Sequence, residues 1–144
     1  HAKDTINKIK NHIKSKGNNS KTIPYPKASG VRFKKIAKKT EMGEIGDNFL
    51  FLHHKWGPWI HLRVLLTDAQ INSTQAISSS DVCIHCGKCI EACPVNALSE
   101  TNFNIKKCRE RQEQLDSSHS CEICARSCPI GEAPEKIKLV KLDE

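Results

Sequence analysis

The sequence has no long apolar run, and no stretch approaches the roughly eighteen apolar residues that suggest a membrane-spanning helix. Nothing at its start resembles a signal peptide. The 144 residues are 38% hydrophobic and only 5% aromatic, and the mean hydropathy is -0.51. We therefore expect a cytoplasmic protein without a membrane span. Its apolar core is modest, so bound metal is expected to supply much of the folding free energy.

Acidic residues are also missing, from every position between Asp4 and Glu41. The first forty residues carry twelve Lys or Arg and one acid, whereas the remaining chain has a net charge of about −4 from the same composition. Such a basic segment binds nucleic acid or an acidic partner, or is simply a solvated face. Because Tyr25 and Phe33 are the only aromatic residues within it, the solvated face is the plainer interpretation.

All eight cysteines lie between positions 83 and 128. The first run, VCIHCGKCIEACP, has the CxxCxxCxxxCP spacing typical of bacterial proteins that hold [4Fe-4S] clusters. The second set keeps one CxxC step and its final proline, but its first gap is stretched to twelve residues. Two sets of four thiolates predict two clusters.

A tight CxxCxxC loop brings three sulfurs to one cluster, so the fourth ligand must come from elsewhere in the chain. In two-cluster ferredoxins the fourth cysteine of each run binds the other cluster. The proline that follows each crossing cysteine helps the chain leave one cluster for the other. We assign Cys83, Cys86, Cys89 and Cys128 to cluster I, and Cys93, Cys108, Cys121 and Cys124 to cluster II.

Structural zinc and disulfide bonds are the alternative uses of these cysteines. Zinc sites usually separate two CxxC pairs by a longer gap, so the packed first run argues against zinc. Disulfides suit small secreted domains, and the CxxC steps favour metal instead.

Two helices are predicted before the cysteines and one between them. The first begins at Asp4 as N-cap, packs an isoleucine stripe through Ile6, Ile9 and Ile13, and ends at Gly17. The second spans residues 31–40, with Val31, Ile36 and Ala37 able to face a core. The third covers residues 108–115, after a turn and a short strand near residues 103–105. A loop is expected over residues 17–22.

Residues 49–66 predict a β-hairpin, because two apolar runs, 49–53 and 59–66, flank the turn sequence KWGP. His53, His54 and His61 on it are candidate metal ligands, but facing side chains without metal are the commoner interpretation. The nearby tryptophans, Trp56 and Trp59, either shield a cofactor or pack in the hairpin.

These patterns together predict an α+β protein in three parts. Residues 1–71 form a small basic α/β segment, residues 72–81 a polar linker, and residues 82–144 a double [4Fe-4S] ferredoxin-like domain that ends in a charged tail.

Residues 31–71 and 82–131 resemble the C-terminal half of the epoxyqueuosine reductase and corrinoid reductive dehalogenase group. The resemblance is carried by the glycine segment MGEIGDN, the Gly57 to Trp59 turn, the Leu-Thr-Asp sequence at 66–68, and Ala97 and Leu98 after the first cysteine run. The isolated Cys108 and the CxxCxxxCP sequence of residues 121–129 complete it. Set against that resemblance, we expect the chain to be truncated relative to the family.

The resemblance implies that residues 42–71 are the end of a nitroreductase-like domain that holds cobalamin. It also implies that the two clusters transfer electrons to that cobalamin. It also makes Tyr25 a candidate proton donor, although a structural role is the alternative. Two features depart from the family pattern. Asp47 stands where the family has lysine, and the family's carboxylate upstream of the glycines has no counterpart, because no Asp or Glu lies between Asp4 and Glu41.

The sequence thus favours electron transfer through two [4Fe-4S] clusters, with a redox partner protein and the oxygen sensitivity of an anaerobe's protein. The alternative is an enzyme, a shortened corrinoid-dependent oxidoreductase. Contact with tRNA through the basic segment is a third possibility that the resemblance raises.

Overall fold

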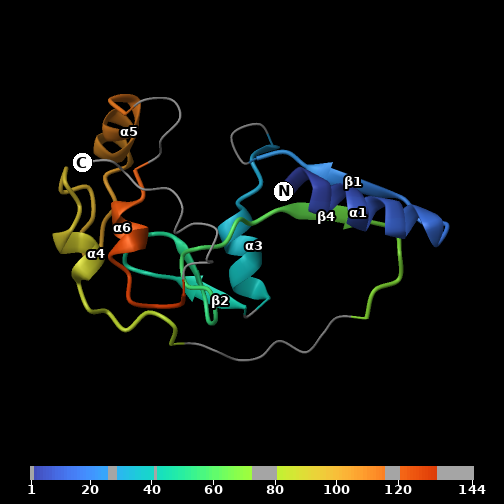
Figure 1. Cartoon of the computed structure of the whole chain (residues 1–144), viewed down its shortest axis with the longest axis horizontal. Helices are drawn as coiled ribbons and strands as arrows, with labels where there is room; N and C mark the ends of the chain where they lie inside the picture. The colour runs from blue at the N-terminus through green and yellow to red at the C-terminus, as the bar shows by residue number, and fades with distance from the viewer. Residues whose placement is uncertain (1, 26–28, 41, 73–80, 116–120, 133–144) are drawn as a thin grey trace.

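The computed structural model describes residues 2–25, 29–40, 42–72, 81–115 and 121–132 (Figure 1). This part of the chain mixes helices with short strands, as the α+β prediction requires. Within it, no helix is both long and apolar enough to cross a membrane. Most of the predicted linker and the charged tail beyond residue 132 lie outside the described residues. The elements are α1 (Ala2–Ser15), β1 (Ser20–Ile23), α3 (Phe33–Lys39), β2 (Gly43–Ile45), β3 (Phe51–His53), β4 (Val64–Thr67), α4 (Lys88–Glu91), α5 (Ile105–Glu113) and α6 (Ile123–Arg126).

Helix α1 confirms the first predicted helix, with two corrections. It begins at Ala2, so Asp4 lies in its first turn rather than at the N-cap. Gly17 ends it as predicted, with φ of 81° and its N–H donating to the Lys14 carbonyl. Ile6 and Ile13 are half-buried but Ile9 is 48% exposed. The apolar face that α1 packs on its neighbouring two-stranded sheet is therefore narrower than the predicted isoleucine stripe, because Ile9 is largely outside it.

That sheet pairs β1 with β4 in antiparallel register, from Ser20 opposite Thr67 to Ile23 opposite Val64. The predicted loop over residues 17–22 is therefore wrong in its second half, which is strand. The Asp68 carboxylate fixes the pairing by accepting hydrogen bonds from the Asn19 backbone N–H at 2.7 Å and its side-chain amide at 2.9 Å. These hydrogen bonds lower the pKa of Asp68.

The centre of the molecule is α3 packed on the antiparallel pair β2 and β3 (Figure 1). Helix α3 confirms the second predicted helix, but Phe33 and Ala37 are its buried residues, and Ile36 is 41% exposed. Leu52 on β3 is only 1% exposed and is the most buried large side chain of the described residues. This small core supports the loop that precedes β3.

The predicted hairpin over residues 49–66 is wrong in its pairing. Strand β3 pairs back onto β2 through the turn at residues 46–50, where the Asn48 side chain accepts a hydrogen bond from the Leu50 N–H at 2.9 Å. Strand β4 pairs with β1 instead. Only the His53 to Gly57 bridge remains of the predicted turn. Pro58 follows and has no N–H to continue the pairing. The Gly57 backbone packs against the backbone of Ile130.

The cysteine-rich end holds α4, α5 and α6 on the side of the molecule away from α1 (Figure 1). Helix α5 confirms the third predicted helix but begins three residues early, because Asn104 caps it by accepting a hydrogen bond from the Lys107 N–H at 3.1 Å. The predicted strand near residues 103–105 is reduced to one bridge between Leu98 and Phe103. Helices α4 and α6 contact each other and carry one cysteine each from the two runs, Cys89 and Cys124.

Candidate iron–sulfur centre

The eight thiols, all free, are divided between two cavities. The smaller cavity is lined by Asp47 and Asn48 of the glycine segment and by Pro129 and Ile130. Four cysteines line it: Cys83, Cys86, Cys89 and Cys128. This cysteine group is called site I below.

The larger cavity, of about 710 Å³, is lined by the other four cysteines. Its remaining wall comes from the middle of the chain, including Lys34, Phe49 and the segment 58–61. The cysteines are Cys93, Cys108, Cys121 and Cys124, called site II below. Each site therefore offers four sulfur donors, the donor set that a cubane [4Fe-4S] cluster requires.

Local backbone geometry shapes the first cysteine run. His85 and Gly87 have φ of 50° and 72°, so the chain turns sharply on both sides of Cys86 before α4 begins. This left-handed geometry costs a non-glycine residue such as His85 free energy, and such cost is concentrated at functional loops. At the end of the run, the Ala97 N–H donates to the Cys93 sulfur at 3.2 Å. Backbone amides that point at ligand sulfurs stabilise their thiolate form.

The strongest electrostatic interactions of Cys124 and Cys128 are with thiols of their own site. Burial raises the pKa of Cys124 to about 11, and its neighbours Cys121, Cys108 and Cys93 add to the rise. Burial also raises the pKa of Cys128, with contributions from Cys83 and Cys86. These shifts favour the protonated thiol at Cys124 and Cys128, and each of the two must release a proton to become a ligand. Because protons compete, metal loading weakens as the pH is lowered.

Within the part of the chain that the structure describes, His53, His54 and His61 do not join a cysteine in a cluster of metal-ligating side chains. The His53 and His54 rings stack at 4.2 Å, and His53 accepts a hydrogen bond at Nδ1 from the Lys55 N–H at 3.1 Å. Burial lowers the pKa of His53, with smaller contributions from His54 and Lys55. His61 lies apart, on the wall of the larger cavity.

Tyr25 lies on the wall of the larger cavity but is 54% exposed. The Arg63 guanidinium lies 4.3 Å above the Tyr25 ring and also donates a hydrogen bond to its hydroxyl oxygen. Trp59 lines the same cavity, whereas Trp56 is partly exposed beneath the Lys55 ammonium at 4.9 Å.

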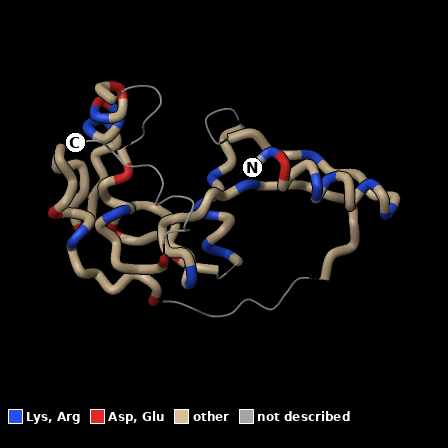
Figure 2. Tube along the Cα trace, viewed as in Figure 1, with Lys and Arg blue, Asp and Glu red and all other residues tan. Residues whose placement is uncertain are grey.

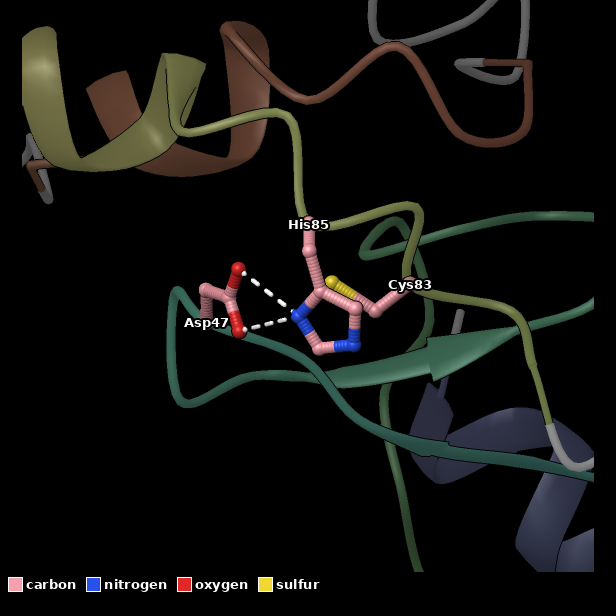
Figure 3. A group of neighbouring side chains, drawn as sticks. All are labelled: Asp47, Cys83 and His85. Atoms are coloured by element: carbon pink, nitrogen blue, oxygen red, sulfur yellow. Dashed lines mark hydrogen bonds and ion pairs between the residues drawn. The ribbon is translucent and has the colours of Figure 1, made fainter. Parts of the chain in front are cut away.

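Three charged residues close to the cysteines were missed by the sequence analysis. In the sequence Asp47 stands out only as a departure from a family pattern, and nothing there links Glu44 or Lys34 to the cysteines. Among the described residues, one cluster of potential metal-ligating side chains has its ligand atoms within 4.8 Å of one another, and it consists of Asp47, Cys83 and His85 (Figure 3). No local sequence signal points to these contacts, because Asp47 and Cys83 are 36 positions apart.

Comparison with known proteins identifies the class first. Residues 76–99, which include Cys83, Cys86, Cys89 and Cys93, match the family model "4Fe-4S binding domain". This match supports an iron–sulfur protein and a redox role for it.

The particular relatives are epoxyqueuosine reductases, which confirms the resemblance predicted from the sequence. The enzyme of Synechococcus sp. (strain RCC307) is 30% identical over 65% of this chain and 32% of its own length. That of Lactococcus garvieae is 26% identical over 67% of this chain and 31% of its own. The chain thus spans about a third of the length of these curated relatives.

Solved structures agree on the fold. Epoxyqueuosine reductase from Streptococcus thermophilus superposes with a TM-score of 0.67 at 22% identity, over 92% of this chain and 40% of that one. An epoxyqueuosine reductase in complex with a tRNA-Tyr epoxyqueuosine-modified tRNA stem loop superposes with a TM-score of 0.69 at 19% identity, over 89% and 37%. The arrangement of the described elements is therefore that of a part of these enzymes.

Proposed function

We propose that the chain holds two [4Fe-4S] clusters, one at each site, and passes single electrons through them to a redox partner protein. The observation that carries this proposal is the division of the eight cysteines into two cavities with four thiols in each. Each cluster supplies reversible one-electron chemistry because its charge is spread over four irons. We further propose residues 82–144 as the domain that holds both clusters, joined by the linker 72–81 to the segment 1–71.

The two sites are close enough to interact. The Cys89 thiolate of site I contributes to the raised pKa of Cys124 in site II, and α4 and α6, which carry these cysteines, are in contact. Cys93 and Cys128, the fourth cysteine of each run, line the cavity of the other run. This crossed arrangement ties the two sites into one unit and supports electron exchange between them.

A corrinoid-dependent reductase is the second candidate, and the large cavity is the observation that favours it. Its volume of about 710 Å³ is within the usual range of cofactor and ligand pockets. Site II forms one wall, and Trp59, Ile60 and His61 form another, so a bound cofactor would lie beside that site. We propose that residues 42–71 correspond to the end of the nitroreductase-like domain in such an enzyme, with Tyr25 as a candidate proton donor at the cavity.

One anaerobic experiment distinguishes the two candidates. Iron and sulfide are quantified on the purified protein, and the visible spectrum is recorded before and after cobalamin is added. We expect about eight irons per chain, four for each cluster. A stoichiometric cobalamin spectrum would support the reductase, whereas no response to cobalamin would support a dedicated electron carrier. About four irons would overturn the two-cluster proposal.

We also propose that the basic segment contacts RNA, as suggested by the relative solved with a tRNA stem loop. Figure 2 shows Lys and Arg distributed along α1 and α3. Lys8 and Lys14 are exposed residues of α1. Phosphate contacts release counterions, so binding of a tRNA stem loop is expected to weaken steeply with salt. Replacing Lys8 and Lys14 by glutamine should reduce the slope of log K against log salt by about 2, while Lys106→Gln on α5 should leave it unchanged. Undetectable or salt-insensitive binding would contradict this proposal.

A further inference from the structure

Site I is flanked by a carboxylate that comes from outside the cysteine region. The Asp47 carboxylate accepts a hydrogen bond from His85 Nδ1 at 2.9 Å, and one of its oxygens lies within 4.8 Å of the Cys83 sulfur (Figure 3). Its side chain is only 15% exposed, whereas the His85 ring is 74% exposed. The charge of Asp47 is thus poorly screened by water and close to a ligand sulfur. It also contributes to the raised pKa of Cys89, after burial.

A second carboxylate approaches the same ligand. Glu44 Oε1 accepts a hydrogen bond from the Cys83 backbone N–H at 2.5 Å. Both acids belong to the segment around β2, so one short stretch places two negative charges beside Cys83. The segment around β2 therefore places two carboxylates beside the ligands of site I.

Site II has the opposite surroundings. Lys34 lies on the wall of the larger cavity together with the four cysteines, and its ammonium donates a hydrogen bond to the Phe49 carbonyl. Lys34 is an exposed residue overall, yet partial burial lowers its pKa, while the Cys124 and Cys108 thiolates raise it. Arg126 lines the same cavity, but its guanidinium is paired with Glu122 at 3.9 Å. Lys34 is thus a cation held toward site II.

We propose that Asp47 and Lys34 set the order of the two reduction potentials, lower at site I and higher at site II, so that the electron rests beside the large cavity. This inference depends on the proposed two-cluster function. It assigns each residue a role in positioning charge, not in binding the clusters.

The physical reason is that reduction adds one negative charge to a site. A fixed anion nearby opposes that charge and a fixed cation favours it, each by an energy that falls with distance and with the local dielectric. An oxygen of Asp47 lies within 4.8 Å of the Cys83 sulfur, and Lys34 lines the cavity of site II. For charges so placed, we expect about a tenfold change in the ratio of reduced to oxidised sites at a given potential. Tenfold for one electron corresponds to about 59 mV.

The test is an anaerobic redox titration of the iron-loaded chain, followed by electron paramagnetic resonance, with every variant measured at the same fixed pH. Two one-electron transitions are expected. Asp47→Asn removes the charge at nearly constant shape. It should raise the lower reduction potential, so that the ratio of reduced to oxidised site I at a given potential rises about tenfold, and it should leave the upper potential unchanged. Lys34→Met should lower the upper reduction potential by a similar amount, and Lys34→Arg should keep that potential at its original value.

Matched controls remove one charge elsewhere. Lys35→Met changes the neighbouring exposed lysine of α3, and Glu113→Gln changes an exposed acid of α5. Neither should move a transition. The variants themselves assign the two transitions to the two sites, because each variant shifts only the transition of the site that its residue faces.

The outcomes separate this inference from the function on which it depends. About four irons and one transition would overturn both. About eight irons and two transitions would keep the proposed function. In that case the inference fails if Asp47→Asn moves the upper transition, if both variants move the same transition, or if Lys35→Met acts as strongly as Lys34→Met.

Discussion

Replacement of Gly57 by alanine is expected to destabilise the iron-loaded protein by more than about 4 kcal/mol, a loss reached only when backbone strain or overpacking is severe. Gly57 has φ of 51°, and a Cβ there would lie 1.8 Å from the Ile130 carbonyl oxygen and 2.7 Å from its carbon. Both atoms are backbone, so no side-chain rotation relieves the overlap. The segment that follows Cys128 must move, and the site I ligand with it. The measurements are thermal unfolding and iron per chain.

Gly17 offers the matched control. It has φ of 81°, yet no atom lies within 4 Å of a Cβ built on it. Gly17→Ala therefore tests the conformational cost of positive φ alone, which is about 1 to 2 kcal/mol. Iron content should not change in this variant. Equal losses of stability for Gly17→Ala and Gly57→Ala would contradict the argument that the packing of Gly57 on Ile130 is what makes glycine necessary.

The contact is reciprocal, since a Cβ on Gly131 would lie 2.1 Å from the Gly57 nitrogen. The sequence predicted a turn at Gly57, from the KWGP pattern, but gave no sign that its backbone crosses a segment more than seventy positions away. Two glycines so far apart carry no common spacing or periodicity. A crossing of this kind becomes visible only when the chain is folded.

Local chemistry explains what the sequence did predict. The spacing of Cys83, Cys86 and Cys89 is a constraint on three sulfurs in one short loop, so it is legible without any tertiary structure. The helix that ends at Gly17 is equally local, because a glycine with positive φ and its hydrogen bond to Lys14 lie within one turn.

Long-range pairing explains what it did not. The apolar residues 64–67 have the composition of a strand, but composition does not say which strand is the partner. The choice of β1 depends on Asn19, whose backbone and side chain both donate to Asp68 across 49 positions. Lys34 and Asp47 were missed as neighbours of the cysteines for the same reason, because the fold, and not the sequence order, brings them there.

The largest expected loss of metal comes from a pair of cysteine substitutions that removes one ligand from each site. A grouping in which each cysteine run binds its own cluster predicts a different iron content for the same pair. Cys89→Ala combined with Cys128→Ala removes two ligands from site I, so about four irons at site II should remain. Cys89→Ala combined with Cys93→Ala removes one ligand from each site, so both clusters should be lost or unstable. Iron and sulfide per chain are measured after anaerobic reconstitution.

The comparison is decisive because the alternative grouping reverses it. If all four cysteines of the first run bound one cluster, the pair at positions 89 and 93 would keep about four irons and the pair at 89 and 128 would lose nearly all. The single variants Cys89→Ala and Cys124→Ala are the controls, each expected to keep about four irons. Cys89 lines the cavity of site I and Cys124 that of site II, so each substitution should leave the cluster at the other site in place.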